Sequence, residues 1–290
     1  MRKLLLQLDS SRLPSVFDRI VAHDAGADDV MSYGGVVEGD VRDLIHGCIF
    51  TRGPKDLKHT AVFIGGADMT AGEGLLRAAR NTFFGPFSVS LMLDSNGSNT
   101  TAVAAVMKLL EVAGELRGTR VAVLAGTGPV GLRAAGLLAK QGAEVLITSR
   151  SSESGTRAQQ TVSQRFGGAV QARTVAGPDD AARALEGAVV VLNAGPAGVQ
   201  LLPKRAWAGR AGLRALADVN AVPPQGVEGV EPNDDGIEKD GVRCFGALAI
   251  GNFKMKLHRA CIARLFERND LVLDAESIAD LARDLGKTRS

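Results

Sequence analysis

The hydrophobic positions of this chain fall into short continuous runs, typical of buried strands, separated by longer stretches with helical spacing. Before residue 118, strands are predicted at 4–8, 60–64 and 88–93, and helices at 14–25, 71–81 and 100–113. A polar residue, Ser98 or Asn99, is expected to cap the last of these helices. Strands that alternate with helices predict an α/β unit.

The same alternation continues after residue 118, with strands predicted at 120–125, 143–148, 169–174, 188–193 and 213–219. This order predicts a doubly wound, Rossmann-type parallel sheet. The segment 252–285 is predicted to be helical, and Leu257, Cys261 and Leu265 repeat one turn apart on one face, which we expect to pack on the first domain. We therefore expect an α/β protein with one domain at 1–117, completed by helices in 252–290, and a second at 118–251.

A glycine-rich turn follows the predicted strand at 120–125. It consists of Gly126, Thr127, Gly128, Pro129, Val130 and Gly131, and it leads into a helix predicted at 132–140. In a dinucleotide-binding turn, one glycine allows the tight turn, the second lets the backbone approach a pyrophosphate, and the third lets the helix pack on the strand. The order of strand, turn and helix favours a nucleotide site over a glycine-rich turn without a ligand.

The next predicted strand ends in Ser149, Arg150 and Ser151. It lacks the carboxylate that binds the ribose 2′-hydroxyl in NAD enzymes, whereas a guanidinium and two hydroxyls suit a 2′-phosphate. The sequence therefore predicts NADP as the cofactor, although Arg150 could also be a solvated loop residue. Ala194, Gly195 and Asn220 follow two later strands, where ligands of open α/β sheets bind, and they complete the predicted cofactor site.

A dense polar run, 93–101, lies between a predicted strand and helix of the first domain. Short hydrogen-bonding side chains at a helix N-terminus can bind a planar heterocycle, and a cap with an Asx-turn is the alternative. Asp18 could hold an amino-pyrimidine through paired hydrogen bonds or be a surface charge beside Arg19. Lys254 and Lys256 begin the last helical segment, and helix lysines are usually solvated.

Composition excludes several classes of function. The chain has 290 residues, a net charge of +2 and 4% aromatic residues, which argues against a nucleic-acid binder. Three scattered cysteines fit buried thiols in a reducing cytosol. They do not predict a metal site, and no His-Glu-x-x-His pattern occurs in the sequence. The apolar run near the N-terminus is too short for a signal peptide, and no membrane span is predicted. We expect a cytoplasmic protein.

Several stretches resemble the NADP-dependent methylenetetrahydromethanopterin dehydrogenases of methylotrophic bacteria, and the likeness runs essentially from end to end. They are Thr51-Arg-Gly, Phe84-Gly-Pro-Phe87, Met92-Leu-Asp-Ser-Asn-Gly-Ser-Asn-Thr-Thr101, Leu124-Ala-Gly-Thr-Gly-Pro-Val-Gly131, Phe245-Gly-Ala-Leu and Lys256-Leu-His-Arg-Ala-Cys-Ile-Ala263. The resemblance implies hydride transfer from the methylene bridge of a pterin one-carbon carrier to NADP, giving the methenyl form, within one-carbon metabolism. Methylenetetrahydrofolate is implied as a further substrate, with a cleft between substrate and dinucleotide domains.

The resemblance also implies roles for single residues. It makes Lys256 the first candidate for a functional lysine, and it supports Asp18, Asp94, Asn96, Ser98 and Thr100 as pterin contacts. Bifunctional folate relatives use a Tyr-x-x-x-Lys pair for hydration of the methenyl product, but here Val37 stands four residues after Tyr33, so cyclohydrolase activity is not expected. Two alternatives are a shikimate-dehydrogenase-like oxidoreductase and a non-catalytic NADP sensor. We expect a homo-oligomer.

Overall fold

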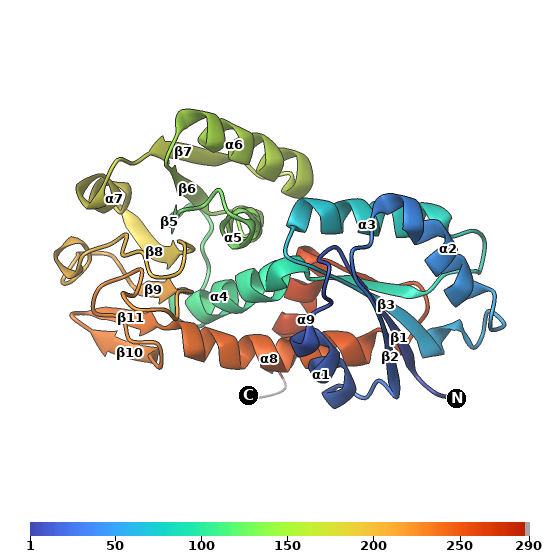
Figure 1. Cartoon of the computed structure of the whole chain (residues 1–290). Helices are drawn as coiled ribbons and strands as arrows, with labels where there is room; N and C mark the ends of the chain where they lie inside the picture. Colours follow the sequence, from blue (N-terminus) through green and yellow to red (C-terminus); the bar gives the residue numbers. More distant parts are fainter. Residues whose placement is uncertain (288–290) are drawn as a thin grey trace. The chain divides into compact units, whose positions relative to one another are not determined.

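A computed structural model describes residues 1–287 of the chain (Figure 1). The chain divides into two compact units, Met1–Thr100 together with the residues from Met255 onward, and Thr101–Lys254. The limits of the units fall inside two long helices, α4 (Ser98–Ala113) and α8 (Ala247–Arg264). The division into compact units therefore does not test the predicted domain limits near residues 117 and 251, and these limits stay a prediction.

The first unit contains a five-stranded parallel sheet in the order β12-β4-β3-β1-β2. Its strands are β1 (Leu4–Asp9), β2 (Asp29–Tyr33), β3 (Thr60–Gly65), β4 (Ser90–Leu93) and β12 (Val272–Leu273). Its remaining helices are α1 (Val16–Asp24), α2 (Glu38–Ile49), α3 (Met69–Thr82) and α9 (Ala275–Lys287). Every residue of β3 is buried, as expected for a central strand covered by helices on both faces. The strand order reverses between β1 and β3, so the carboxyl ends of these strands form a topological switch point.

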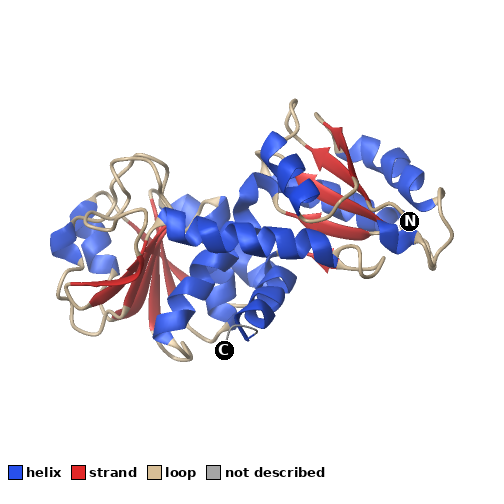
Figure 2. Ribbon diagram, turned by 90° about the horizontal axis from the view of Figure 1, so that it is seen from below, coloured by secondary structure: helices blue, strands red, loops and turns tan. Residues whose placement is uncertain are grey.

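The second unit contains a seven-stranded sheet in the order β10-β11-β9-β8-β5-β6-β7. Its strands are β5 (Arg120–Leu124), β6 (Glu144–Ser149), β7 (Val170–Thr174), β8 (Ala188–Asn193), β9 (Ala215–Asp218), β10 (Asp235–Lys239) and β11 (Val242–Phe245). Its own helices are α5 (Pro129–Lys140), α6 (Ser152–Phe166) and α7 (Pro178–Ala184), and helices flank both sheets of the molecule (Figure 2). Only β10 is antiparallel to its neighbour among the described strands. The order reverses between β5 and β8, which is the arrangement of a Rossmann-type domain.

The structure confirms the predicted α/β class and the buried face of the last helical segment. Leu257 and Cys261 of α8, and Leu265 directly after its last residue, are completely buried. Two predictions were wrong. The segment 252–285 is not wholly helical, because β12 pairs with β4 at the sheet edge. The amide of Thr100, in the first turn of α4, bonds to the carboxylate of Asp94 at 3.0 Å, so Asp94 caps this turn in place of Ser98 or Asn99.

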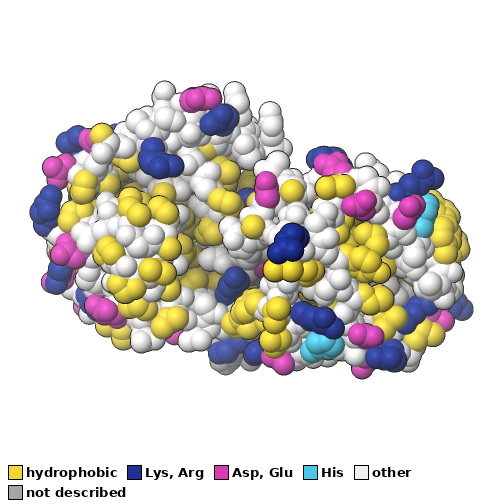
Figure 3. Space-filling model, viewed as in Figure 1, with side chains coloured by type: hydrophobic (Ala, Val, Ile, Leu, Met, Phe, Trp, Pro, Cys, Tyr) yellow, Lys and Arg dark blue, Asp and Glu magenta, His cyan; other side chains and the backbone are white. Residues whose placement is uncertain are grey.

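The surface is mixed in charge, as the composition predicts. On the face in Figure 3, basic and acidic side chains are interspersed rather than gathered into a field of one sign. Among the helices of residues 1–287, none is long and apolar enough to span a membrane.

Candidate functional site

The predicted phosphate-binding turn lies at the switch point of the second sheet, directly after β5. A Cβ on Gly126 would lie 2.7 Å from the Cβ of Ile147, and one on Gly131 would lie 2.7 Å from the Cα of Gly126. These two glycines therefore let the turn pack against β6 and let α5 approach the turn. A Cβ on Gly128 would meet only the carbonyl oxygen of Ala125, at 3.9 Å, so the space above Gly128 is open to a ligand.

Helix α5 presents its N-terminus at this turn. Pro129 is its first residue, and the Gly128 N-cap makes no side-chain hydrogen bond to the helix. The first-turn N–H groups and the positive end of the helix dipole therefore suit a pyrophosphate. Arg133, one turn further along, is buried and donates to the carbonyl of Pro129 at 3.0 Å. Its positive charge next to the helix N-terminus escaped the sequence analysis, because a helical arginine is usually solvated.

The end of β6 carries the residues predicted to bind a 2′-phosphate. The hydroxyl of Ser149 donates to the carbonyl of Ser151 at 2.7 Å, and the hydroxyl of Ser151 caps α6 by accepting the amide of Ser154 at 3.2 Å. Both serines thus shape the turn. The Arg150 side chain is exposed beside the N-terminus of α6, where it can meet an anion.

The remaining predicted cofactor residues lie along the same edge of the sheet. Ala194 follows β8 directly, and its amide bonds to the carbonyl of Leu124, the last residue of β5, at 3.0 Å. The amide of Gly195 bonds to the side-chain oxygen of Asn193 at 3.2 Å, and Asn220 is buried in the loop after β9. The structure therefore brings the predicted cofactor residues to the carboxyl ends of four adjacent strands.

The polar run of the first unit forms a 3-10 turn (Ser95–Gly97) followed by the start of α4, and most of its side chains are buried. Asp94 accepts the hydroxyl of Thr100 at 2.6 Å as well as its amide. The hydroxyl of Ser98 donates to the carbonyl of Ser95 at 2.9 Å, and the Asn99 amide donates to the carbonyl of Leu93 at 2.5 Å. These side chains therefore fix the shape of the loop.

Asn96 and Asp18 differ from the rest of the predicted pterin contacts, because each is at least partly accessible. Asn96 is exposed, with a left-handed φ of 55°, and its amide bonds to the carbonyl of Gly66 at 2.6 Å. Asp18, in the first turn of α1, is half-buried, and a Cβ placed on Gly65 would lie 3.7 Å from its carboxylate. The Asp18 carboxylate and the backbone of Asn96 therefore lie close to the end of β3, at the switch point of the first sheet.

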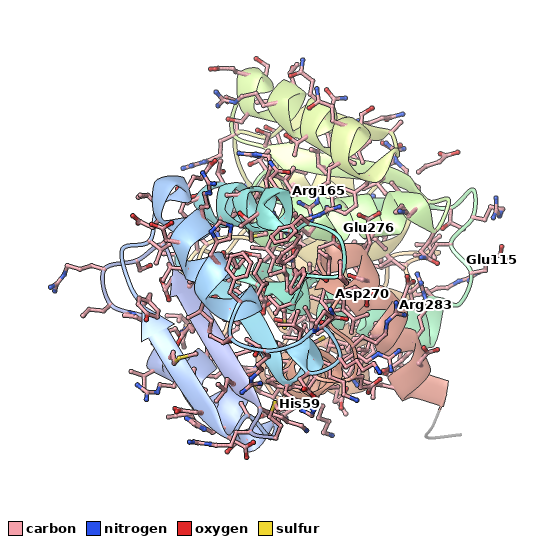
Figure 4. All side chains as sticks on the ribbon, turned by 90° about the vertical axis from the view of Figure 1, so that its right-hand side faces the viewer. His59, Glu115, Arg165, Asp270, Glu276 and Arg283 are labelled. Atoms are coloured by element: carbon pink, nitrogen blue, oxygen red, sulfur yellow. The ribbon has the colours of Figure 1, made fainter. Side chains whose placement is uncertain are left out.

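His258 joins this group, although the sequence analysis gave it no role. It is 1% exposed, and its ring stacks on Phe63 with 5.5 Å between the ring centroids. Its Nδ1 lies 3.6 Å from a carboxylate oxygen of Asp94, and its ring contacts the half-exposed Phe17 edge-on at 6.4 Å. The His59 side chain (Figure 4), by contrast, lies at the amino-terminal edge of the same sheet, because the turn Leu57–His59 leads directly into β3.

The two candidate lysines lie on different faces of α8. Lys254 precedes His258 by one helical turn, so the two side chains share a face. Lys256 is exposed and stands about 160° around the helix axis from His258, at 3.6 residues per turn. The structure thus brings Lys254, but not Lys256, onto the face that carries the buried histidine.

The cysteines do not form a reactive or metal-binding site in the part of the chain that is described. Within residues 1–287, no group of three or more His, Cys, Asp or Glu side chains could hold a metal ion. All three cysteines are free and buried, and burial raises the pKa of Cys48 to about 12 and that of Cys244 to about 11. Such thiols stay protonated and unreactive at neutral pH.

Solved structures with the same fold include two oxidoreductases. The ligand-free 5-ketofructose reductase of Gluconobacter sp. strain CHM43 is 14% identical with a TM-score of 0.51, and the match covers 98% of this chain and 99% of that one. Shikimate 5-dehydrogenase from Listeria monocytogenes, solved with shikimate and NAD, is 11% identical with a TM-score of 0.53, over 98% and 96%. At these identities the likeness shows a shared fold and nothing further.

Sequence relatives identify the family. Residues 16–96 match the family model described as methylene-tetrahydromethanopterin dehydrogenase, N-terminal. The "Bifunctional protein MdtA" of Methylorubrum extorquens is 48% identical over 98% of this chain and 99% of the relative. The NAD(P)-dependent methylenetetrahydromethanopterin dehydrogenase of the same organism is 32% identical, again over 98% and 99%. The chain therefore belongs to the methylenetetrahydromethanopterin dehydrogenase family.

Proposed function

We propose that this protein oxidises methylenetetrahydromethanopterin to its methenyl form with NADP, and that it also accepts methylenetetrahydrofolate. The observation that carries the proposal is the open Gly128 turn at the switch point of one sheet, in a chain that is 48% identical to a relative over nearly its full length. The polar groups at the switch point of the other sheet support a second, heterocyclic ligand.

The second unit would hold the dinucleotide. Bound NADP supplies the hydride acceptor of the reaction. The glycine-rich turn from Gly126 to Gly131 would surround the pyrophosphate. It includes Thr127, Pro129 and Val130 as well as the three glycines. Arg150 would pair with the 2′-phosphate while Ser149 and Ser151 hold the turn in shape. Ala194, Gly195 and Asn220 would contact the nicotinamide half beyond β8 and β9.

The first unit would bind the pterin. A carboxylate and an amide, Asp18 and Asn96, are accessible at the end of β3 and can form paired hydrogen bonds to the amino-pyrimidine edge. Asp94, Ser98 and Thr100 would act mainly by holding the loop that presents Asn96, because their polar atoms bond within the loop. Phe17 offers an apolar ring to the flat face of the heterocycle.

The chemistry requires little from acid–base groups. The bridge carbon lies between two nitrogens whose lone pairs stabilise the cation that forms, so no strong base is needed. The protein must instead hold the reacting atoms at about 3–3.5 Å and exclude water. His258 and Phe63 are buried and stacked on each other next to Asp94 of the polar loop, and their burial suits the exclusion of water.

For the functional lysine we favour Lys254 over Lys256. The family resemblance pointed to Lys256, but helix phase puts Lys254 on the face of His258. An ammonium group there could donate to the pterin carbonyl and orient the ring. Lys256, which the family resemblance favours, is the alternative.

Paired variants decide between the lysines. Lys254→Ala is expected to lower kcat/KM for the methylene carrier roughly tenfold or more, the effect of a lost charged hydrogen bond, with NADP affinity unchanged. Lys256→Ala is the matched control and should stay within about twofold of the unmodified protein. The reverse result, a loss confined to Lys256→Ala, would overturn the phase argument and restore Lys256.

Steady-state kinetics with both methylene carriers, shikimate, NADP and NAD test the function itself. We expect NADP reduction with a methylene carrier and none with shikimate. Turnover of shikimate would favour the alternative oxidoreductase that shares the fold. Tight NADP binding without turnover of either carrier would favour an NADP sensor.

We further propose that the protein works in the cytoplasm as a homo-oligomer. Its buried, protonated thiols are compatible with a reducing compartment. Phe50 and Phe84 are 60% and 48% exposed, and their rings lie 5.8 Å apart, which supports burial of this patch against another subunit. Light scattering of the purified protein measures the oligomeric state directly, and a monomer would contradict this part of the proposal.

A further inference from the structure

In the second sheet, a buried carboxylate joins β8 and β9, the two strands on one side of the switch point. Asn193 and Asp218 end β8 and β9 and are paired in register. The side-chain amide of Asn193 donates to the Asp218 carboxylate at 2.7 Å, and the two residues are 0% and 1% exposed. Such a pair needs further hydrogen bonds, because an ionised carboxylate without partners is costly to bury.

Asp218 obtains those bonds from the loop that follows it. Its carboxylate accepts the backbone amides of Asn220 at 3.0 Å and of Val227 at 2.9 Å, so it holds both ends of the segment 219–227. The segment fits closely, because a Cβ on Gly226 would overlap the side-chain amide of Asn193. Burial raises the pKa of the Asp218 carboxyl, and these donors oppose the rise.

The two asparagines extend the network to the loop after β8. Asn193 accepts the amide of Gly195 at 3.2 Å through its side-chain oxygen. Asn220 accepts the amides of Val222 at 2.9 Å and Gly198 at 3.4 Å. One carboxylate and two amides therefore hold the loops 194–198 and 219–227 in a single arrangement.

The position of these loops connects them with one half of the cofactor. A dinucleotide crosses the sheet edge at the switch point between β5 and β8. Arg150, the predicted partner of the 2′-phosphate, lies at the end of β6, so the adenosine half belongs on the β6 side. The nicotinamide half then belongs on the side of β8 and β9, next to the loops that the network holds.

We propose that Asp218, acting through Asn193 and Asn220, is a positioning residue for the nicotinamide half of NADP. The inference rests on the proposed function, because it needs NADP as the ligand. Asp218 is too buried to touch the cofactor, so it acts through the backbone of the two loops. A carboxylate suits the role because both of its oxygens accept, whereas an asparagine would turn one acceptor into a donor that faces other N–H groups.

Binding of NADP and of adenosine 2′,5′-bisphosphate to Asp218→Asn tests the proposal. The bisphosphate carries the adenosine half alone. We expect the variant to bind NADP roughly tenfold more weakly, the effect of leaving buried donors unsatisfied in one loop, and the bisphosphate within about twofold of the unmodified protein. Asp234→Asn is the matched control, since Asp234 is also buried and accepts a backbone amide, from Glu231 at 2.7 Å, in another loop. It should leave both affinities unchanged.

Asn193→Ala keeps the test decisive if Asp218→Asn does not fold, because Asn193 is completely buried and has no assigned contact with the cofactor. It removes the hydrogen bonds to Asp218 and from Gly195 but leaves the carboxylate in place, and the same selective loss of NADP affinity is expected. Equal weakening of NADP and bisphosphate, or normal binding of NADP by both variants, would overturn the proposal. Failure of the unmodified protein to bind the bisphosphate would instead refute NADP as the cofactor.

Discussion

Arg150→Ala tests the choice of cofactor most directly. The variant removes a guanidinium that lies beside the N-terminus of α6. The hydroxyls of Ser149 and Ser151 hold the surrounding turn, so the turn should keep its shape without Arg150. A charged hydrogen bond contributes about 1.5–3 kcal/mol. Because Arg150 is exposed, water and salt screen its charge, and the lower value is expected. A loss of about 1.5 kcal/mol corresponds to roughly tenfold weaker NADP binding.

Calorimetric titration with NADP and with NAD measures this difference. NAD lacks the 2′-phosphate, so its affinity should change by less than about twofold. Raising the salt concentration should shrink the gap between the variant and the unmodified protein, since the interaction is ionic and exposed. Arg205→Ala is the control, because Arg205 is another exposed arginine of this unit, paired with Asp179 at 3.0 Å. Equal weakening of NADP and NAD by Arg150→Ala would refute the 2′-phosphate role.

Four further outcomes are expected. Gly128→Val should fold normally but lose NADP binding, because the space above Gly128 is open in the protein; normal binding would exclude the turn as the phosphate site. Gly131→Ala should lower the free energy of unfolding by roughly 1–3 kcal/mol, since its Cβ meets backbone, and urea unfolding measures this. Asp94→Asn should cost a similar roughly 1–3 kcal/mol through the weakened bonds from Thr100, and unchanged unfolding would show that the bonds contribute little. Burial raises the pKa of Cys244 from 9.0 to about 11, so between these pH values the folded protein keeps a proton that the unfolded chain loses. The free energy of unfolding should therefore fall as the pH rises from 9 to 11. Cys244→Ala should reduce this dependence on pH.

The sequence predicted the parts of the fold whose signals are local. Strands such as β3 and β8 are buried on both faces and appear as continuous apolar runs. The strand β12 has two residues and exists only because it pairs with β4, some 180 residues earlier in the chain. A contact over that distance leaves no periodic trace. The edge strand β10 was missed for a related reason, since it is largely exposed and lacks an apolar run.

The polar run at 93–101 shows what composition could not decide. Seven polar residues and a glycine between a strand and a helix predicted either a ligand site or a cap, and the structure shows that several of the polar side chains bond within the loop. Asp94 and Thr100 bond to each other, whereas Asn96 is exposed. Asn96 also differs in its backbone, which is left-handed with a φ of 55°. Asparagine tolerates that conformation well, but its presence in a loop does not by itself predict it.

Helix α8 gives a second example, because its rotation about its own axis decides which side chains share a face. A resemblance in sequence marks a stretch of residues, and within that stretch Lys256 and His258 are near neighbours. In a helix, residues two positions apart lie on nearly opposite sides, while residues four apart share a face. The helix α8 runs unbroken from Ala247 to Arg264 and buries His258, and its geometry puts Lys254, but not Lys256, on the face of that histidine. The buried histidine, and not the stretch of sequence, is therefore the reason why we propose Lys254.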